Sequence, residues 1–230
     1  VAEIYKKFFS DEVGEEAFDK LEQMFPNVLK ASGLNHKKPK ISVLVDVSPS
    51  MNANKRIYSA TETLQNIIDT KLTSSDYISL DCFASRHDQV VQMTKLTPEA
   101  RSIVNDAVYA LNFRCTAGVT HFYKALKEVG ENIIMSKKNS EQALVFALTD
   151  GEDNEYNTRQ STVRKLFKEN NITLMIITIG IQKNGSTYRK LLELVESQEF
   201  LIAANGDDRS AIDEAMKTGF DFVQQHGSVV

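Results

Sequence analysis

Hydrophobic and polar positions follow two different patterns along the 230 residues of this chain. In residues 1–36, apolar side chains recur at helical spacing with charged residues between them, which predicts an N-terminal helical extension. From residue 37 onward, short continuous apolar runs alternate with longer amphipathic segments. Continuous runs are typical of strands buried on both faces, and amphipathic segments are typical of surface helices. We therefore expect residues 37–230 to form one α/β domain.

The apolar runs predict six strands, and the amphipathic segments predict six helices. The strands are expected at residues 41–45, 77–83, 89–93, 143–148, 172–179 and 200–203. The helices are expected at residues 55–72, 98–111, 122–135, 158–169, 187–196 and 209–225. The second of these helices has a clear start signal, because Thr97 is a suitable N-cap residue and Pro98 occupies the first helical position.

Strands that alternate with helices build βαβ units and hence a mostly parallel sheet. Strands 77–83 and 89–93 are the exception, because so short a connection between two strands makes them antiparallel. The predicted fold is therefore a three-layer αβα, Rossmann-like open sheet with helices on both faces. This sheet is mostly parallel and has one short antiparallel edge strand.

Composition narrows the classes of function. The formal net charge of -4 argues against a nucleic-acid partner, since nucleic-acid-binding surfaces carry a basic excess. No run of about 18 apolar residues is present, so we expect no membrane insertion. Two cysteines, Cys82 and Cys115, are too few for a disulfide framework. We expect two reduced thiols, with Cys82 packed as a small hydrophobic side chain.

Polar loops follow two of the expected strands, and ligands of open parallel sheets bind beyond the carboxyl ends of the strands. Asp46, Ser48 and Ser50 follow strand 41–45, Asp150 follows strand 143–148, and a third polar loop contains Thr120. We expect strands 41–45 and 143–148 to be neighbours in the sheet, at the point where the strand order reverses. All five side chains offer oxygen, which selects a hard cation. A site with only five oxygen-bearing side chains is suitable for Mg²⁺, because Mg²⁺ keeps several of its waters when it binds. Mn²⁺ and Ca²⁺ are the alternatives.

The polar loops resemble the metal-ion-dependent adhesion site (MIDAS) of von Willebrand factor A domains, the family that includes the integrin inserted domain. The matching segments are Asp46-x-Ser48-x-Ser50, Thr120 and Thr149-Asp150-Gly151. The resemblance extends over residues 40–225, because the order of strands and helices also fits. It implies that the first Asp, both Ser and the Thr bind the ion or its waters, and that the second Asp binds through water. Pro49 and Val119 stand where the family often has Gly.

This resemblance implies a metal-dependent protein-interaction module and not an enzyme. An acidic side chain of a partner protein is expected to replace a water on the ion. Two alternatives stay open at this point. One is a Mg²⁺-dependent phosphatase or hydrolase with Asp46 as nucleophile, although Ser48 stands where such enzymes place a second Asp. The other is a scaffold domain of the same fold that binds no metal.

Four further residues are predicted at the rim of the site, where they would touch the partner protein: Met51, His121, Glu152 and Asp153. The sequence also gives signals about the cell compartment. The absence of a signal-peptide pattern and the low cysteine content favour the cytoplasm. An extracellular location stays open, because the family resembled occurs both inside and outside cells.

Overall fold

The structure is a computed structural model, and it describes residues 40–115, 118–137, 141–151, 153, 158–206 and 208–226. Residues 223–226 are described by their backbone alone. The helical extension predicted for residues 1–36 lies outside the described residues and stays a prediction.

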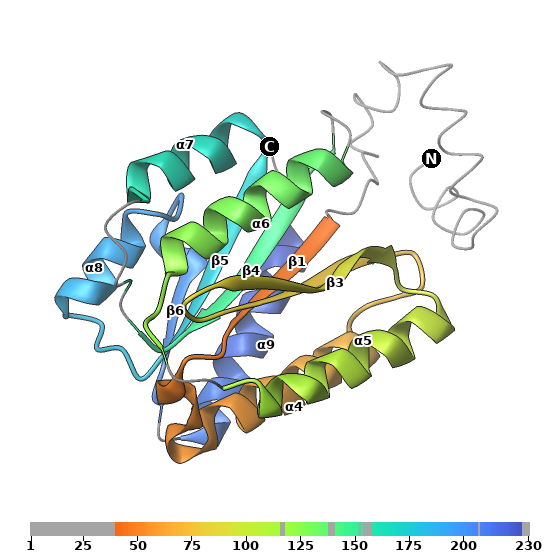
Figure 1. Ribbon diagram of the computed structural model, residues 1–230, viewed down its shortest axis with the longest axis horizontal. Coiled ribbons are helices and arrows are strands. Elements are labelled where there is room, and N and C mark those ends of the chain that lie inside the picture. Colours follow the sequence, from red (N-terminus) through yellow and green to blue (C-terminus); the bar gives the residue numbers. More distant parts are fainter. Residues whose placement is uncertain are drawn as a thin grey trace. The chain divides into compact units, whose positions relative to one another are not determined.

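All six predicted strands and all six predicted helices are present (Figure 1). The strands are β1 (Lys40–Asp46), β2 (Tyr77–Phe83), β3 (His87–Lys95), β4 (Ala143–Thr149), β5 (Ile172–Ile179) and β6 (Leu201–Ala204). The helices are α4 (Arg56–Thr70), α5 (Pro98–Ala110), α6 (Phe122–Ser136), α7 (Gln160–Glu169), α8 (Ser186–Leu192) and α9 (Arg209–His226). Within the described ranges, short 3₁₀ segments lie between some of these elements: η1 (Pro49–Lys55), η2 (Leu111–Phe113) and η3 (Gln198–Phe200).

The six strands form one sheet in the order β3-β2-β1-β4-β5-β6. Every neighbouring pair is parallel except β2 and β3, which are antiparallel. This confirms the predicted sheet and its antiparallel edge strand, although β3 extends two residues beyond the prediction at each end. The strand order reverses between β1 and β4, so these two strands are neighbours, as expected. Their carboxyl ends therefore meet at one place on the sheet edge.

Two layers of helices cover the two faces of the sheet (Figure 1). Side chains of α4, α5 and α9 share one core with alternate residues of the strands, such as Val43 and Val45. Side chains of α6, α7 and α8 share the other core with the residues between them, such as Leu44. Burial on both faces explains why the central strands are almost continuously apolar. The three-layer αβα architecture is therefore confirmed.

Local signals in the sequence account for two further details. The Thr97 hydroxyl accepts a hydrogen bond from the backbone N–H of Ala100 at 3.3 Å, and Pro98 begins α5, so the predicted helix start is confirmed. Cys82 is 2% exposed and packs in the core, as expected for a small hydrophobic side chain. Cys115 is half-buried, and neither thiol forms a disulfide.

Candidate metal centre

The ends of β1 and β4 place two carboxylates side by side. Asp46 is the last residue of β1, and it is completely buried. Asp150 directly follows β4, and its side chain is also fully covered. Because β1 and β4 are hydrogen-bonded neighbours in parallel register, the sheet itself holds these two residues at one edge.

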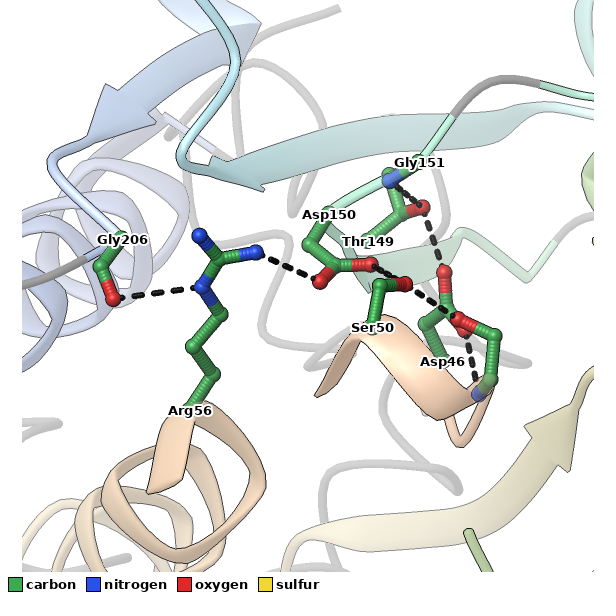
Figure 2. A network of polar contacts seen from close by, with 8 residues as sticks. Asp46, Ser50, Arg56, Thr149, Asp150, Gly151 and Gly206 are labelled. Carbon is green, nitrogen blue, oxygen red and sulfur yellow. Dashed lines mark hydrogen bonds and ion pairs between the residues drawn. The ribbon is translucent and has the colours of Figure 1, made fainter. Parts of the chain in front are cut away.

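An unbroken series of hydrogen bonds joins the residues of the first loop to those of the second (Figure 2). The backbone N–H of Ser48 donates to Oδ1 of Asp46 at 2.8 Å, and the hydroxyls of Ser48 and Ser50 lie 2.9 Å apart. The Ser50 hydroxyl donates to Oδ1 of Asp150 at 2.7 Å, and the Thr149 hydroxyl donates to Oδ2 of Asp46 at 2.8 Å. Ser50 is exposed, so this oxygen cluster is open to solvent on one side.

The third polar loop reaches the same cluster. Thr120 is 6% exposed, and its Oγ1 lies only 3.6 Å from the point that a Cβ atom on Gly151 would occupy. The next residue, His121, donates its backbone N–H to the carbonyl of Ala84 just beyond β2, which fixes the loop on the sheet. The five side chains predicted from the sequence are therefore brought together from three separate segments.

Burial and crowding raise the pKa of Asp46 to about 6. Burial is the largest cause, and the negative charge of Asp150 acts in the same direction. Hydrogen bonds from Ser48 and Thr149 act in the opposite direction, because they favour the ionised carboxylate. An ionised Asp46 is thus costly here, and a cation between the two carboxylates would relieve that cost.

Arg56 is the residue of the centre that the sequence analysis missed. Its Nη1 lies 2.8 Å from Oδ2 of Asp150, and its Nε donates to the carbonyl of Gly206 at 3.2 Å (Figure 2). One signal in the sequence pointed to it. A cation at the first residue of a helix is disfavoured by the helix dipole, so Arg56 at the start of α4 indicates an acidic neighbour.

The rim predicted for a partner protein is partly corrected. Met51 is fully buried in the core, because η1 turns its side chain inward, and it cannot contact a partner. Asp153 is half-buried and accepts a hydrogen bond from the backbone N–H of Tyr123, so it caps the start of α6. His121 is half-buried, and its buried Nδ1 has no hydrogen-bond partner in the described part of the chain. Glu152 lies outside the described residues.

The donor set of the centre fits a hard divalent cation. It contains two carboxylates and three hydroxyls and no sulfur or imidazole, the kind of set that Mg²⁺, Mn²⁺ or Ca²⁺ accept. Among the described residues, no group of three or more His, Cys, Asp or Glu side chains could hold a metal ion. In a bound state, hydroxyl oxygens and waters would have to supply most of the coordination shell of such a cation.

Comparison with known proteins identifies the family. The family model described as "von Willebrand factor type A domain" matches residues 40–217, which is most of the chain. The chain belongs to the von Willebrand factor type A (VWA) family. VWA domains are typically protein-interaction modules and are generally not enzymes. A search of curated proteins gives no match.

Solved structures of VWA domains share the fold. The domain is similar to a von Willebrand factor type A protein from Catenulispora acidiphila, with 20% identity and a TM-score of 0.64 over 79% of this chain and 42% of that one. It is also similar to proximal thread matrix protein 1 from the mussel byssus, solved with a zinc-occupied MIDAS motif. That match has 21% identity and a TM-score of 0.67 over 81% of this chain and 48% of that one.

A third similar structure is the conserved hypothetical protein BatB from Bacteroides thetaiotaomicron, with 13% identity and a TM-score of 0.63 over 81% of this chain and all of that one. At these identities the likeness shows the fold alone. The chain spans less than half the length of the Catenulispora and mussel proteins. No helix in the described part of this VWA domain has both the length and the apolar character needed to cross a membrane.

Proposed function

We propose that this VWA domain binds a partner protein through a divalent cation held by Asp46, Ser48, Ser50, Thr120 and Asp150. The proposed ion is Mg²⁺, with Mn²⁺ or Ca²⁺ as alternatives, and an acidic side chain of the partner completes its coordination shell. Asp46, Ser48, Ser50 and Thr120 would hold the ion or its waters, and Asp150 would hold a bound water. The bound cation supplies the positive charge that a partner carboxylate needs.

One observation carries this proposal. Oxygen atoms from three segments that are far apart in the sequence meet at the carboxyl edge of the sheet. Ser48 binds Asp46 through its backbone N–H and Ser50 through its hydroxyl, and the Ser50 hydroxyl donates to Asp150. Arg56 pairs with Asp150, whereas none of the ion pairs among the described residues involves Asp46, so a cation at the centre would offset the charge of Asp46. The zinc-occupied MIDAS motif of the mussel protein supports a divalent cation in this family, and the oxygen-only set of this chain favours a harder ion than zinc.

Calorimetric titration with Mg²⁺ tests the metal. We expect the wild-type domain to bind one Mg²⁺ and the Asp46→Ala variant to lose measurable binding, because the variant removes the carboxylate at the centre of the cluster. Asp221→Ala is the matched control. This variant also removes one carboxylate. Asp221 is exposed and pairs with Lys71, which follows the last residue of α4, at the opposite end of that helix from Arg56. Absence of Mg²⁺ binding by the wild type would favour the metal-free scaffold.

The partner is tested by affinity capture with the wild-type domain as bait. A partner that binds as proposed is retained in Mg²⁺, released by EDTA, and not retained by Asp46→Ala. Retention that EDTA leaves unchanged contradicts the proposal. The hydrolase alternative makes a different prediction, namely phosphatase turnover in Mg²⁺ that Asp46→Asn abolishes. No observation on the described residues favours it over the binding function.

A further inference from the structure

A positive charge is built into the candidate metal centre. Arg56 pairs with Asp150 at 2.8 Å, and the two side chains are 17% and 0% exposed. Among the ion pairs of the described residues, no other cation pairs with Asp150, and none pairs with Asp46. Arginine side chains carry a fixed positive charge in proteins. The charge of Arg56 therefore belongs to the electrostatics of the centre.

The backbone around Arg56 positions its side chain and leaves space for the guanidinium. Asn54 and Lys55 both have left-handed backbone conformations (φ 50° and 58°), so the chain turns sharply and starts α4 at Arg56. Two glycines leave room for the guanidinium. A Cβ atom on Gly206 would lie 2.8 Å from Nε and Nη2, and one on Gly180 would lie 3.0 Å from Nη2. Figure 2 shows the side chain extended from α4 to a position between Asp150 and Gly206.

We propose that Arg56 sets the charge of the metal-loaded centre and thereby selects an anionic group on the partner. This inference rests on the proposed function. The carboxylates of Asp46 and Asp150 cancel the charge of a divalent cation. The guanidinium adds a positive charge to the loaded centre in a partly buried position, where charges interact strongly. A partner carboxylate neutralises that charge, and a neutral or cationic group does not.

This role has opposite effects on the two ligands. Arg56 repels an incoming divalent cation, so it weakens metal binding. It attracts a carboxylate to the loaded centre, so it strengthens partner binding. If Arg56 merely positioned Asp150, its removal would weaken the binding of both ligands. A displaced Asp150 weakens metal binding and therefore also the binding of a carboxylate to that metal. The sign of each effect separates the two roles.

The test compares Arg56→Gln with Arg56→Lys in the whole domain. Gln keeps a hydrogen-bond donor and loses the charge, whereas Lys keeps the charge. Mg²⁺ affinity is measured by calorimetry. Acetate, as a minimal carboxylate, is then titrated into Mg²⁺-saturated protein and followed by the amide resonance of Gly151. For Arg56→Gln we expect Mg²⁺ to bind about tenfold more tightly and acetate about tenfold more weakly. Arg56→Lys is expected to stay near the wild type for both ligands.

Each outcome decides between the roles. If Arg56→Gln binds Mg²⁺ no more tightly than the wild type, or binds acetate equally well, the inference about Arg56 is wrong while the proposed function stands. If the wild type binds no Mg²⁺, the proposed function and this inference both fail. If Arg56→Gln does not fold, Arg56→Lys alone provides the test. Weaker binding of both Mg²⁺ and acetate by Arg56→Lys would identify a positioning role and overturn the inference.

Discussion

The Asp46→Asn variant is expected to be more stable than the wild type when both are free of divalent cations at pH 7. The pKa of Asp46 lies at about 6 in the folded domain, against an ordinary value of 3.8. Ionising this carboxyl in the folded state therefore costs about 2–3 kcal/mol. An amide avoids that cost and can still accept the hydrogen bond from the N–H of Ser48. For a domain of this size we expect a gain of about 5–10 °C in melting temperature in EDTA.

The pH dependence of this gain follows from the direction of the pKa shift. A raised folded-state pKa means that the stabilising contribution of Asp46 is fully present below pH 3.8 and is lost as the pH rises through about 6. The advantage of Asp46→Asn should accordingly shrink to almost nothing near pH 4. Asp221→Asn, at an exposed position, is the control and should change the free energy of unfolding by less than about 0.5 kcal/mol. Equal stability of Asp46→Asn and wild type at pH 7 would contradict the account of a strained carboxylate.

The Asp81→Ala variant is expected to lose about 3–5 kcal/mol of stability at pH 7. Asp81 on β2 is 1% exposed and accepts hydrogen bonds from the hydroxyls of Ser42 and Ser79 at 3.2 and 3.4 Å. Its Oδ1 lies 2.8 Å from Nε2 of His87, and Nδ1 of His87 lies 3.1 Å from Glu128 on α6. Truncation leaves a buried imidazole without its main partner. Thermal unfolding should show a melting temperature lower by about 10 °C or more.

Charge on His87 makes this effect depend on pH. Burial lowers the pKa of His87, but hydrogen bonds and charges from Asp81 and Glu128 outweigh it, so the pKa is raised. The contribution of the ion pair is thus fully present below pH 6.5 and is lost as the pH rises through the raised pKa. We expect the gap between wild type and Asp81→Ala to narrow at higher pH. Asp88→Ala is the control, because Asp88 and Arg86 form an exposed pair of little worth. A loss below about 1 kcal/mol for Asp81→Ala would show that the pair is dispensable.

Much of the fold could be predicted because it depends on local hydrophobic pattern. Strand β5 is rich in Ile and Thr, and its predicted bounds, residues 172–179, match the structure. The helices were found within a few residues of their ends, where the hydrogen-bond signal is weakest. Strand β3 was predicted too short, because an edge strand is only half-buried and its apolar pattern is correspondingly weak.

The candidate ligands of the metal centre could be predicted from the sequence, but the residues packed around them could not. The three polar loops could be placed at one edge because parallel strands end together. The inward position of Met51 and the turn at Asn54 and Lys55 could not be predicted, because left-handed conformations at non-glycine residues are set by tertiary packing. The pairing of Arg56 with Asp150 joins residues 94 positions apart, so the helix-start position of Arg56 indicates an acidic neighbour without identifying Asp150. The roles of Glu152 and of residues 1–36 stay predictions.

The central claim is that a divalent cation binds among Asp46, Ser48, Ser50, Thr120 and Asp150. Anomalous diffraction from crystals soaked in Mn²⁺ tests it most directly, since Mn²⁺ replaces Mg²⁺ at oxygen sites and scatters anomalously. We predict one strong peak at the carboxyl edge of the sheet, with the Ser48 and Ser50 hydroxyls bonded to the ion at about 2 Å and Asp150 linked through a water. A peak elsewhere, or none at this edge at saturating Mn²⁺, would contradict the claim.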